Sequence, residues 1–190
     1  ATGGERLVMQ EFVQQVNKTI KDSMNGVHTA FPGTIASFDP ATGLATVLPS
    51  MKFKKPDGTT VEYPQITGVP VVFPQSMGQQ ATIAFPIKAG DGCLVIVAEQ
   101  SIDLWMYGQE TNTDLAFDLT NSICIPGMFA KENAAMEDAC AGNAVIVDVG
   151  GTRIAVKAGS VQVDAGSITL NGNVTVKGNL TTQGGVVNLN

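Results

Sequence analysis

Hydrophobic and polar positions change their spacing along the chain, and the first pattern is helical. Between residues 5 and 25, six apolar residues recur every three or four positions, which is the spacing of one helix face. They are Met9, Phe12, Val13, Val16, Ile20 and Met24. Asn25 and Gly26 follow, and both tolerate the left-handed conformation that ends many helices. The pattern predicts a helical arm over residues 1–27, with a helix roughly 30 Å long.

The apolar stripe of this helix has two open interpretations. It either packs on its own domain or docks onto a partner. In the second case Phe12, Val16 and Ile20 face another protein, or the helix packs with further copies of itself.

Residues 28–130 alternate with period two, the spacing of β-strands. Residues 32–39 and 43–53 flank the turn sequence PATG, which predicts a hairpin. Further short strands are expected at 69–74, 81–87, 92–100 and 122–127, with one short helix near 102–108. This set favours a compact Greek-key barrel of the OB type, with a small sandwich as the alternative.

Residues 131–143 look like a linker with some helical tendency, and the composition changes after them. From residue 141 onward there are no aromatic residues, no prolines, nine glycines and five charged residues. Short apolar–polar alternations recur, separated by Gly159, Gly166, Gly172, Gly178 and Gly184. Such a repeat predicts a β-helix or prism over residues 144–190.

Each repeat has one apolar edge, and that edge must be buried. A single chain coiled on itself would form only about three coils, close to the minimum for stacked repeats. Three intertwined chains would close every strand edge and place the apolar residues on a common axis. We therefore expect a homotrimer with a mainly β fold: an N-terminal helix, an OB-like barrel and an intertwined triple-stranded β-helix. The expected trimer core is Val145, Val147, Ile154, Val156, Val161, Val163, Ile168, Leu170, Val174, Val176 and Leu180.

Charge and composition argue against several function classes. The net charge of −6 disfavours sequence-independent nucleic-acid binding and electrostatic adhesion to anionic lipid. No apolar run reaches the length of a membrane span, and no signal peptide is recognisable at the start, so folding in a cytosol is expected. Cys93, Cys124 and Cys140 have no metal-ligand spacing and are expected to be free thiols.

Candidate catalytic groups are sparse. His28 is the single histidine, so any Ser–His–Asp arrangement must use it. Asp91, Glu99, Asp103 and Glu110 could form carboxylate pairs for glycoside cleavage, but they lie beside predicted turns, where exposed acids are common. We expect no enzyme activity, no cofactor and no metal site.

Two phrases carry a resemblance to a known family. GDGCLVIVAEQSIDLW at residues 90–105 and DLTNSICIPG at 118–127, in the order helix, OB-like barrel and β-helix, resemble the central spikes of contractile phage tails. Related spikes occur in type VI secretion systems and R-type bacteriocins. The resemblance implies a homotrimeric structural protein of the tail baseplate that pierces the host outer membrane when the sheath contracts.

The resemblance also implies partners and a location. The implied partners are the tail hub and baseplate proteins at the N-terminal end and, transiently, the host outer membrane. The implied location is the baseplate of the virion, which is assembled in the host cytoplasm. Many such spikes hold iron through an apical His-x-His pair, which this chain lacks. Val187, Asn188, Leu189 and Asn190 are the expected tip, either blunt or covered by a separate capping protein. The alternative is the spike of a bacteriocin or secretion system with an embedded peptidoglycan or polysaccharide hydrolase activity.

Overall fold

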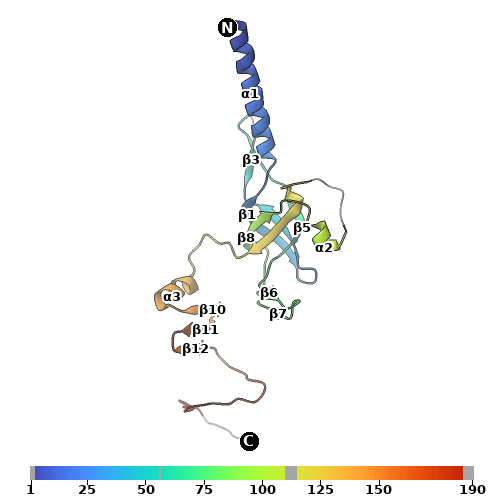
Figure 1. The fold of residues 1–190 in the computed structure, drawn as a ribbon. Coiled ribbons are helices and arrows are strands. Elements are labelled where there is room, and N and C mark those ends of the chain that lie inside the picture. Colours follow the sequence, from blue (N-terminus) through green and yellow to red (C-terminus); the bar gives the residue numbers. More distant parts are fainter. Residues whose placement is uncertain (1–2, 56, 110–114, 186–190) are drawn as a thin grey trace. The chain divides into compact units, whose positions relative to one another are not determined.

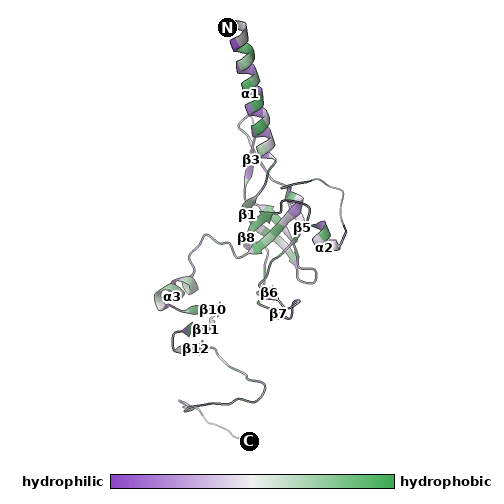
Figure 2. Cartoon of the chain, viewed as in Figure 1, coloured by the Kyte–Doolittle hydropathy of each residue, from purple (hydrophilic) through white to green (hydrophobic). Residues whose placement is uncertain are grey.

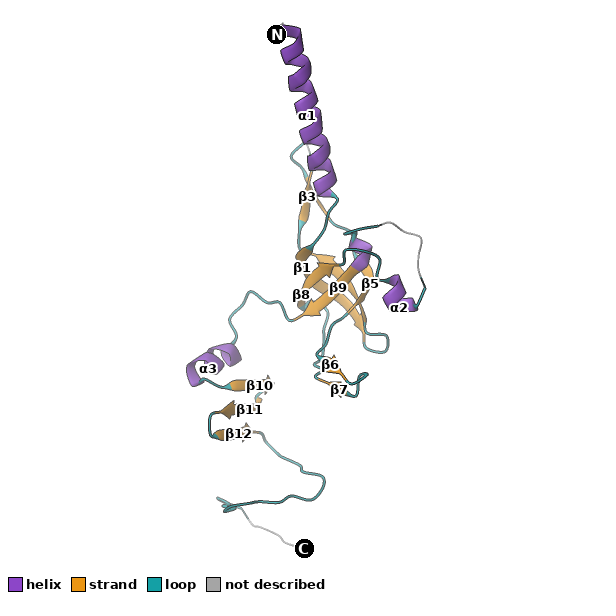
Figure 3. Ribbon diagram, in the orientation of Figure 1, coloured by secondary structure: helices purple, strands orange, loops and turns teal. Residues whose placement is uncertain are grey.

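The computed structural model describes residues 3–55, 57–109 and 115–185, and it contains two compact units, Ala1–Ala130 and Lys131–Asn190 (Figure 1). Figure 3 shows their helices and strands. The elements of the first unit are α1 (Gly3–Asn25), β1 (Ala30–Asp39), β2 (Leu44–Pro49), β3 (Lys52–Lys54), β4 (Thr60–Glu62), β5 (Ile66–Pro70), β6 (Gln75–Ser76), β7 (Ala81–Thr82), β8 (Gly92–Val97), α2 (Asp103–Tyr107), η1 (Leu119–Asn121) and β9 (Ser122–Pro126). The second unit contains α3 (Ala134–Gly142), β10 (Val145–Val149), β11 (Thr152–Lys157) and β12 (Ser160–Asp164).

A five-stranded sheet forms the centre of the first unit. Its strand order is β5-β2-β1-β8-β9, and the neighbouring strands are antiparallel. The two edges of the sheet meet where Val71 forms a parallel bridge with Cys124, and the Val72 N–H donates to the Cys124 carbonyl at 2.9 Å. This order is that of a partly open, OB-like barrel. The mainly β class, the N-terminal helix and an OB-like half-barrel are therefore confirmed.

Alternating side chains of these strands fill the interior of the half-barrel. Cys93, Val95 and Val97 of β8 point inward and are buried, whereas Ile96 between them is 38% exposed. The other buried apolar residues are Phe31, Ile35, Ala45, Val47, Ile66, Val69 and Cys124. A hydrogen bond with Cys93, together with burial, raises the pKa of the Cys124 thiol, so this thiol is a neutral packing group. Cys140 is exposed, and all three cysteines are free.

Local side-chain hydrogen bonds fix the first hairpin. The Asp39 carboxylate accepts hydrogen bonds from the Ala41 N–H and the Thr42 hydroxyl, each at 2.9 Å. Gly43 then adopts a φ of 72° and donates its N–H to the Asp39 carbonyl. This is an aspartate-initiated turn, and it confirms the hairpin predicted around PATG.

The prediction of a full strand over residues 81–87 was wrong. Only Ala81–Thr82 is a strand, and it pairs with β6 in a separate two-stranded sheet. β8, the next barrel strand, already has β1 and β9 as neighbours, so this segment has no place beside it in the sheet. Ile83 is correspondingly 70% exposed.

The phrase DLTNSIC has a structural role. Asp118 caps η1 by accepting from the Thr120 N–H at 2.9 Å and the Thr120 hydroxyl at 2.6 Å. Asn121 and Ser122 are buried, and their side chains donate to the Leu115 and Leu119 carbonyls. Buried polar groups need such partners, so this segment turns the chain into β9 without an unsatisfied donor.

Gly92 lies where the chain after β9 passes over the start of β8. Its carbonyl accepts from the N–H groups of both Gly127 and Met128. A Cβ atom at this position would collide with the Met128 carbonyl oxygen. Gly92, the second glycine of GDGC, is therefore required because the backbone of Met128 approaches it too closely for a side chain.

We predict that Gly92→Ala destabilises the half-barrel by about 1–3 kcal/mol, the usual cost of forcing extra volume into a packed site. Urea unfolding followed by tryptophan fluorescence measures this change. Gly26→Ala is the control, because a Cβ there makes only an ordinary contact at 3.6 Å. Equal unfolding midpoints for the two variants would contradict the prediction.

Asp118 gives the half-barrel a specific pH dependence. Hydrogen bonds from the Thr120 side chain and backbone hold the pKa of this carboxyl below its ordinary value. A lowered folded-state pKa stabilises the fold above about pH 4, the range of the unfolded carboxyl, and the contribution disappears as pH falls through the folded value. Asp118→Ala should cost about 1 kcal/mol at neutral pH, the usual value for a lost cap. Melting temperatures of the two proteins should converge in acid, and a constant difference at all pH values would refute this assignment.

Candidate functional site

The three-stranded sheet of the second unit has two chemically different faces. β10 pairs with β11 and β11 with β12, all antiparallel, with Val147 opposite Ile154 and Ile154 opposite Val163. Because side chains alternate along each strand, this register places seven apolar residues on one face. We call this surface the repeat face; it comprises Val145, Val147, Val149, Ile154, Val156, Val161 and Val163.

The repeat face is exposed to solvent throughout. Its exposed fractions run from 40% for Ile154 to 70% for Val145. Six of its seven residues are predicted trimer-core residues of these strands, and the strand register places all six on one face; their burial in a trimer stays a prediction. Val149 was missed, although it continues the same alternation after Val147. Contiguous exposed apolar surface of this kind marks an interaction site.

The expected strands around Ile168/Leu170 and Val174/Val176 are absent from the described chain. The last strand is β12, and residues 165–185 have no strand hydrogen bonding. Ile168, Leu170 and Leu180 are 60%, 68% and 71% exposed, and Val174 and Val176 are similarly open. The physical reason is that a strand needs a neighbour, and among the described residues no segment forms a ladder with these. Of the predicted β-helix, the single chain shows a three-stranded sheet, and the intertwined trimer stays a prediction.

The opposite face of the sheet is polar and partly covered by α3. Asn133 caps this helix by accepting from the Ala135 N–H at 3.0 Å, so the predicted linker is mostly a capped helix. Arg153 of β11 donates to Asp138 of α3 and, through Nε at 2.8 Å, to Asp148 of β10. These two carboxylates raise the pKa of the Arg153 guanidinium. The ion pairs join α3 to one face of the sheet and leave the repeat face open.

A second exposed apolar surface lies on α1. The six residues of the predicted stripe are all exposed, from 39% for Val16 to 64% for Met9, Phe12 and Met24. We call this surface the helix stripe; it comprises Met9, Phe12, Val13, Val16, Ile20 and Met24. Figure 2 shows hydrophobic and hydrophilic bands alternating along α1. The helix stripe does not pack on the described half-barrel, because all six of its residues are exposed.

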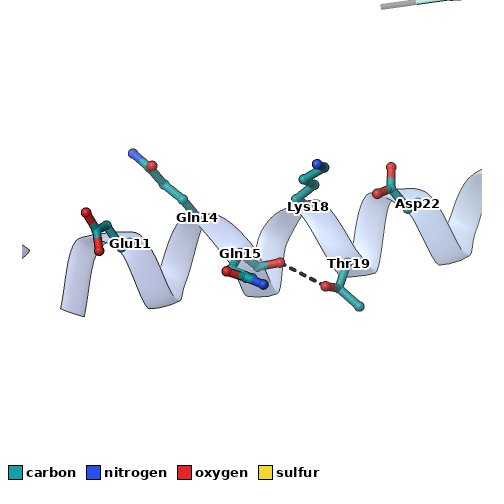
Figure 4. A pocket seen from close by; sticks show the side chains of 6 residues that line it. All are labelled: Glu11, Gln14, Gln15, Lys18, Thr19 and Asp22. Carbon is teal, nitrogen blue, oxygen red and sulfur yellow. Dashed lines mark hydrogen bonds between the residues drawn. The ribbon is translucent and has the colours of Figure 1, made fainter. Parts of the chain in front are cut away.

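The far side of α1 is polar. Glu11, Gln14, Gln15, Lys18, Thr19 and Asp22 line it (Figure 4). Lys18 and Asp22 are one helical turn apart, and the Thr19 hydroxyl donates to the Gln15 carbonyl at 3.0 Å. This side is a solvated face, which leaves the helix stripe as the surface that needs a partner.

Two of the candidate catalytic groups, His28 and Asp91, make local contacts. The His28 N–H donates to the Phe117 carbonyl at 3.1 Å, and the imidazole packs edge-on against Tyr63 with ring centroids 5.7 Å apart. Asp91 accepts from the Lys88 N–H at 2.8 Å within a turn. Across the described ranges, no group of three His, Cys, Asp or Glu side chains is placed to hold a metal ion. Glu110 and the tip residues Val187, Asn188, Leu189 and Asn190 lie outside the described residues.

An open groove on the half-barrel was not predicted. It lies between α2 and the ends of β2 and β5, has a volume of about 520 Å³, and includes Trp105, Met106 and Phe73 in its lining. Trp105 is 74% exposed. The sequence signal was the amphipathic run IDLWMY, which was interpreted only as a short helix.

Membrane-crossing segments can be assessed for the helices of the described chain. None of them, α1 included, combines the length and the apolarity that crossing a bilayer requires.

Comparison with known proteins gives a family match that covers the half-barrel. Residues 31–127, just over half of the chain, match the family model of the phage protein Gp138 N-terminal domain. This range runs from β1 to the end of β9 and so contains the complete half-barrel. No curated protein matches the chain. The family match supports a phage structural protein of the baseplate type. The chain belongs to the family of phage proteins that carry the Gp138 N-terminal domain.

Proposed function

We propose that the chain is the central spike of a contractile phage tail baseplate, a homotrimer that pierces the host outer membrane when the sheath contracts. The single observation that carries this proposal is the exposed repeat face. The family match supports a baseplate-type structural protein, and the repeat face supplies the reason for a spike within that class.

Three chains bury this surface better than one. A three-stranded antiparallel sheet with one apolar face must cover that face, and α3 occupies the other one. Three copies arranged about an axis would bring their repeat faces together there. The unpaired residues 165–185 would then find neighbouring strands in the other two chains, which closes the open edges.

Such an assembly suits a mechanical role. A spike must not open under load, and forced unfolding is governed by the rate of unfolding. Three interlocked chains cannot separate one at a time. The low charge of residues 141–190 also reduces the cost of passing through a bilayer. The work comes from sheath contraction, so the proposed spike needs no turnover and no cofactor of its own.

We assign the thin C-terminal end to the host side and the N-terminal end to the tail hub. The C-terminal repeats lack aromatic residues and prolines, whereas the half-barrel and α1 lie before them in the chain. A spike that pierces a membrane enters it with its narrower end first. A baseplate map with residue 190 toward the tube would reverse this orientation.

Assembly through the repeat face is tested by adding charge to it. Val163→Asp places three carboxylates on the proposed axis, where burial without a partner costs several kcal/mol per ion, so the variant should be monomeric. Ser160→Asp is the matched control, because position 160 lies on the other face of β12 beside Lys157. Light scattering should give trimers for the wild type and for Ser160→Asp. A monomeric wild type with folded repeats would overturn the proposal.

Metal content and hydrolysis separate this spike from its alternatives. These 190 residues contain one histidine, His28, which precedes the half-barrel, so they hold no His-x-His pair. We predict that the purified trimer holds no stoichiometric iron by elemental analysis. One tightly bound metal per trimer would contradict this prediction. Cleavage of peptidoglycan or polysaccharide that a single His28 or acidic substitution abolishes would favour the spike with lytic activity.

A further inference from the structure

The helix stripe has the spacing of a coiled coil. Met9, Val13, Val16 and Ile20 are separated by four, three and four residues, which makes them successive d, a, d and a positions of a heptad. Phe12 and Met24 flank this seam and widen the apolar arc to about 120° at 3.6 residues per turn. An arc of this width is broader than the narrow seam of a two-stranded coil.

The residue types on the seam select the number of strands. Val13 and Ile20 at a and Val16 at d are all β-branched. In parallel coiled coils, β-branched residues at a with leucine at d favour two strands, whereas β-branched residues at both positions shift the preference to three or more. The seam contains no leucine between Met9 and Met24.

Charge placement fits an interface between identical chains. About a threefold axis the a and d residues of each layer meet their own copies, so a charge at these positions would meet its own kind, while the g position of one helix faces the e position of the next. From Met9 to Met24 the e and g positions are Gln10, Phe12, Asn17, Thr19 and Met24, and none is charged. The charges of this stretch, such as Glu11, Lys18 and Asp22, lie on the polar side drawn in Figure 4.

The helix also needs a partner for its own stability. Helices in water gain most of their stability from packing an amphipathic face rather than from propensity. α1 contains Val8, Val13, Val16, Thr19 and Ile20, whose β-branching lowers helix propensity further. Four residues, 26–29, connect α1 to β1, so a trimer would hold three copies of the helix close together at a high effective concentration.

We propose that three copies of α1 form a parallel three-stranded coiled coil with Met9, Val13, Val16 and Ile20 at its centre. This inference rests on the homotrimer of the proposed function and extends it to the N-terminal end. The occupant of the helix stripe is then a second and a third copy of the same helix.

Cysteine cross-linking in the full chain tests this assignment. Ile20→Cys places a thiol on the seam, and Lys18→Cys places one on the polar side as the matched control (Figure 4). Both are made with Cys140→Ser, because Cys140 is the exposed native thiol and Cys93 and Cys124 are buried. Under mild oxidation, Ile20→Cys should form disulfide-linked dimers roughly a hundredfold faster than Lys18→Cys, the gain expected from the effective concentration within a bundle.

The outcomes separate this inference from the proposed function. Fast cross-linking at position 20 alone, with a trimer by light scattering, supports the coiled coil. A trimeric mass with equal, slow cross-linking of both variants overturns the coiled coil and leaves the homotrimer standing. A monomeric mass without cross-linking overturns both.

Discussion

The apolar face of the β10–β12 sheet is the constraint on which the second unit depends. Register and pleat put valine and isoleucine on one side, and the Arg153 ion pairs hold α3 on the other. Because α3 covers the polar face, the sheet could bury the repeat face against α3 only by breaking the Arg153 ion pairs. Residues 165–185 have a greater need, because within the described ranges they form no strand ladder and their apolar side chains are exposed. Association with further chains answers both needs at once.

The half-barrel differs in this respect from the segments on either side of it. Its strands bury a continuous core from Phe31 to Cys124, its edges meet at Val71, and its buried polar residues are paired. It buries its apolar side chains within one chain, unlike the two segments that flank it in the sequence. Those segments, α1 and the repeats, both present apolar side chains in the periodicity of their own secondary structure. In α1 and in β10–β12, secondary structure is thus formed while the apolar side chains stay exposed.

Local chemistry explains which features were predictable from the sequence. The first hairpin follows from Asp39 and Gly43, whose turn conformation needs only neighbouring residues. The composition of the repeat face follows from alternation alone, because a period of two decides the side of a sheet. The prediction of a strand over residues 81–87 was wrong although these residues have a strand-like pattern, because the five-stranded sheet has no free position beside β8. The strands predicted around Ile168 and Val174 are absent for a related reason. A strand needs a neighbouring strand to pair with, and an alternating sequence does not supply one. The Arg153–Asp138 pair joins residues from different elements, and no local signal marks it.

Amide hydrogen exchange of residues 166–185 in the wild-type protein tests the central claim most directly. If three chains pair their repeats, these amides gain interchain hydrogen bonds and should exchange orders of magnitude more slowly than an unstructured peptide. The β8 amides are the internal reference, because their hydrogen bonds to β1 and β9 lie within one chain. An intertwined trimer should protect the amides of both β8 and residues 166–185. Protected β8 amides together with exchange at the unstructured rate across 166–185 would contradict it.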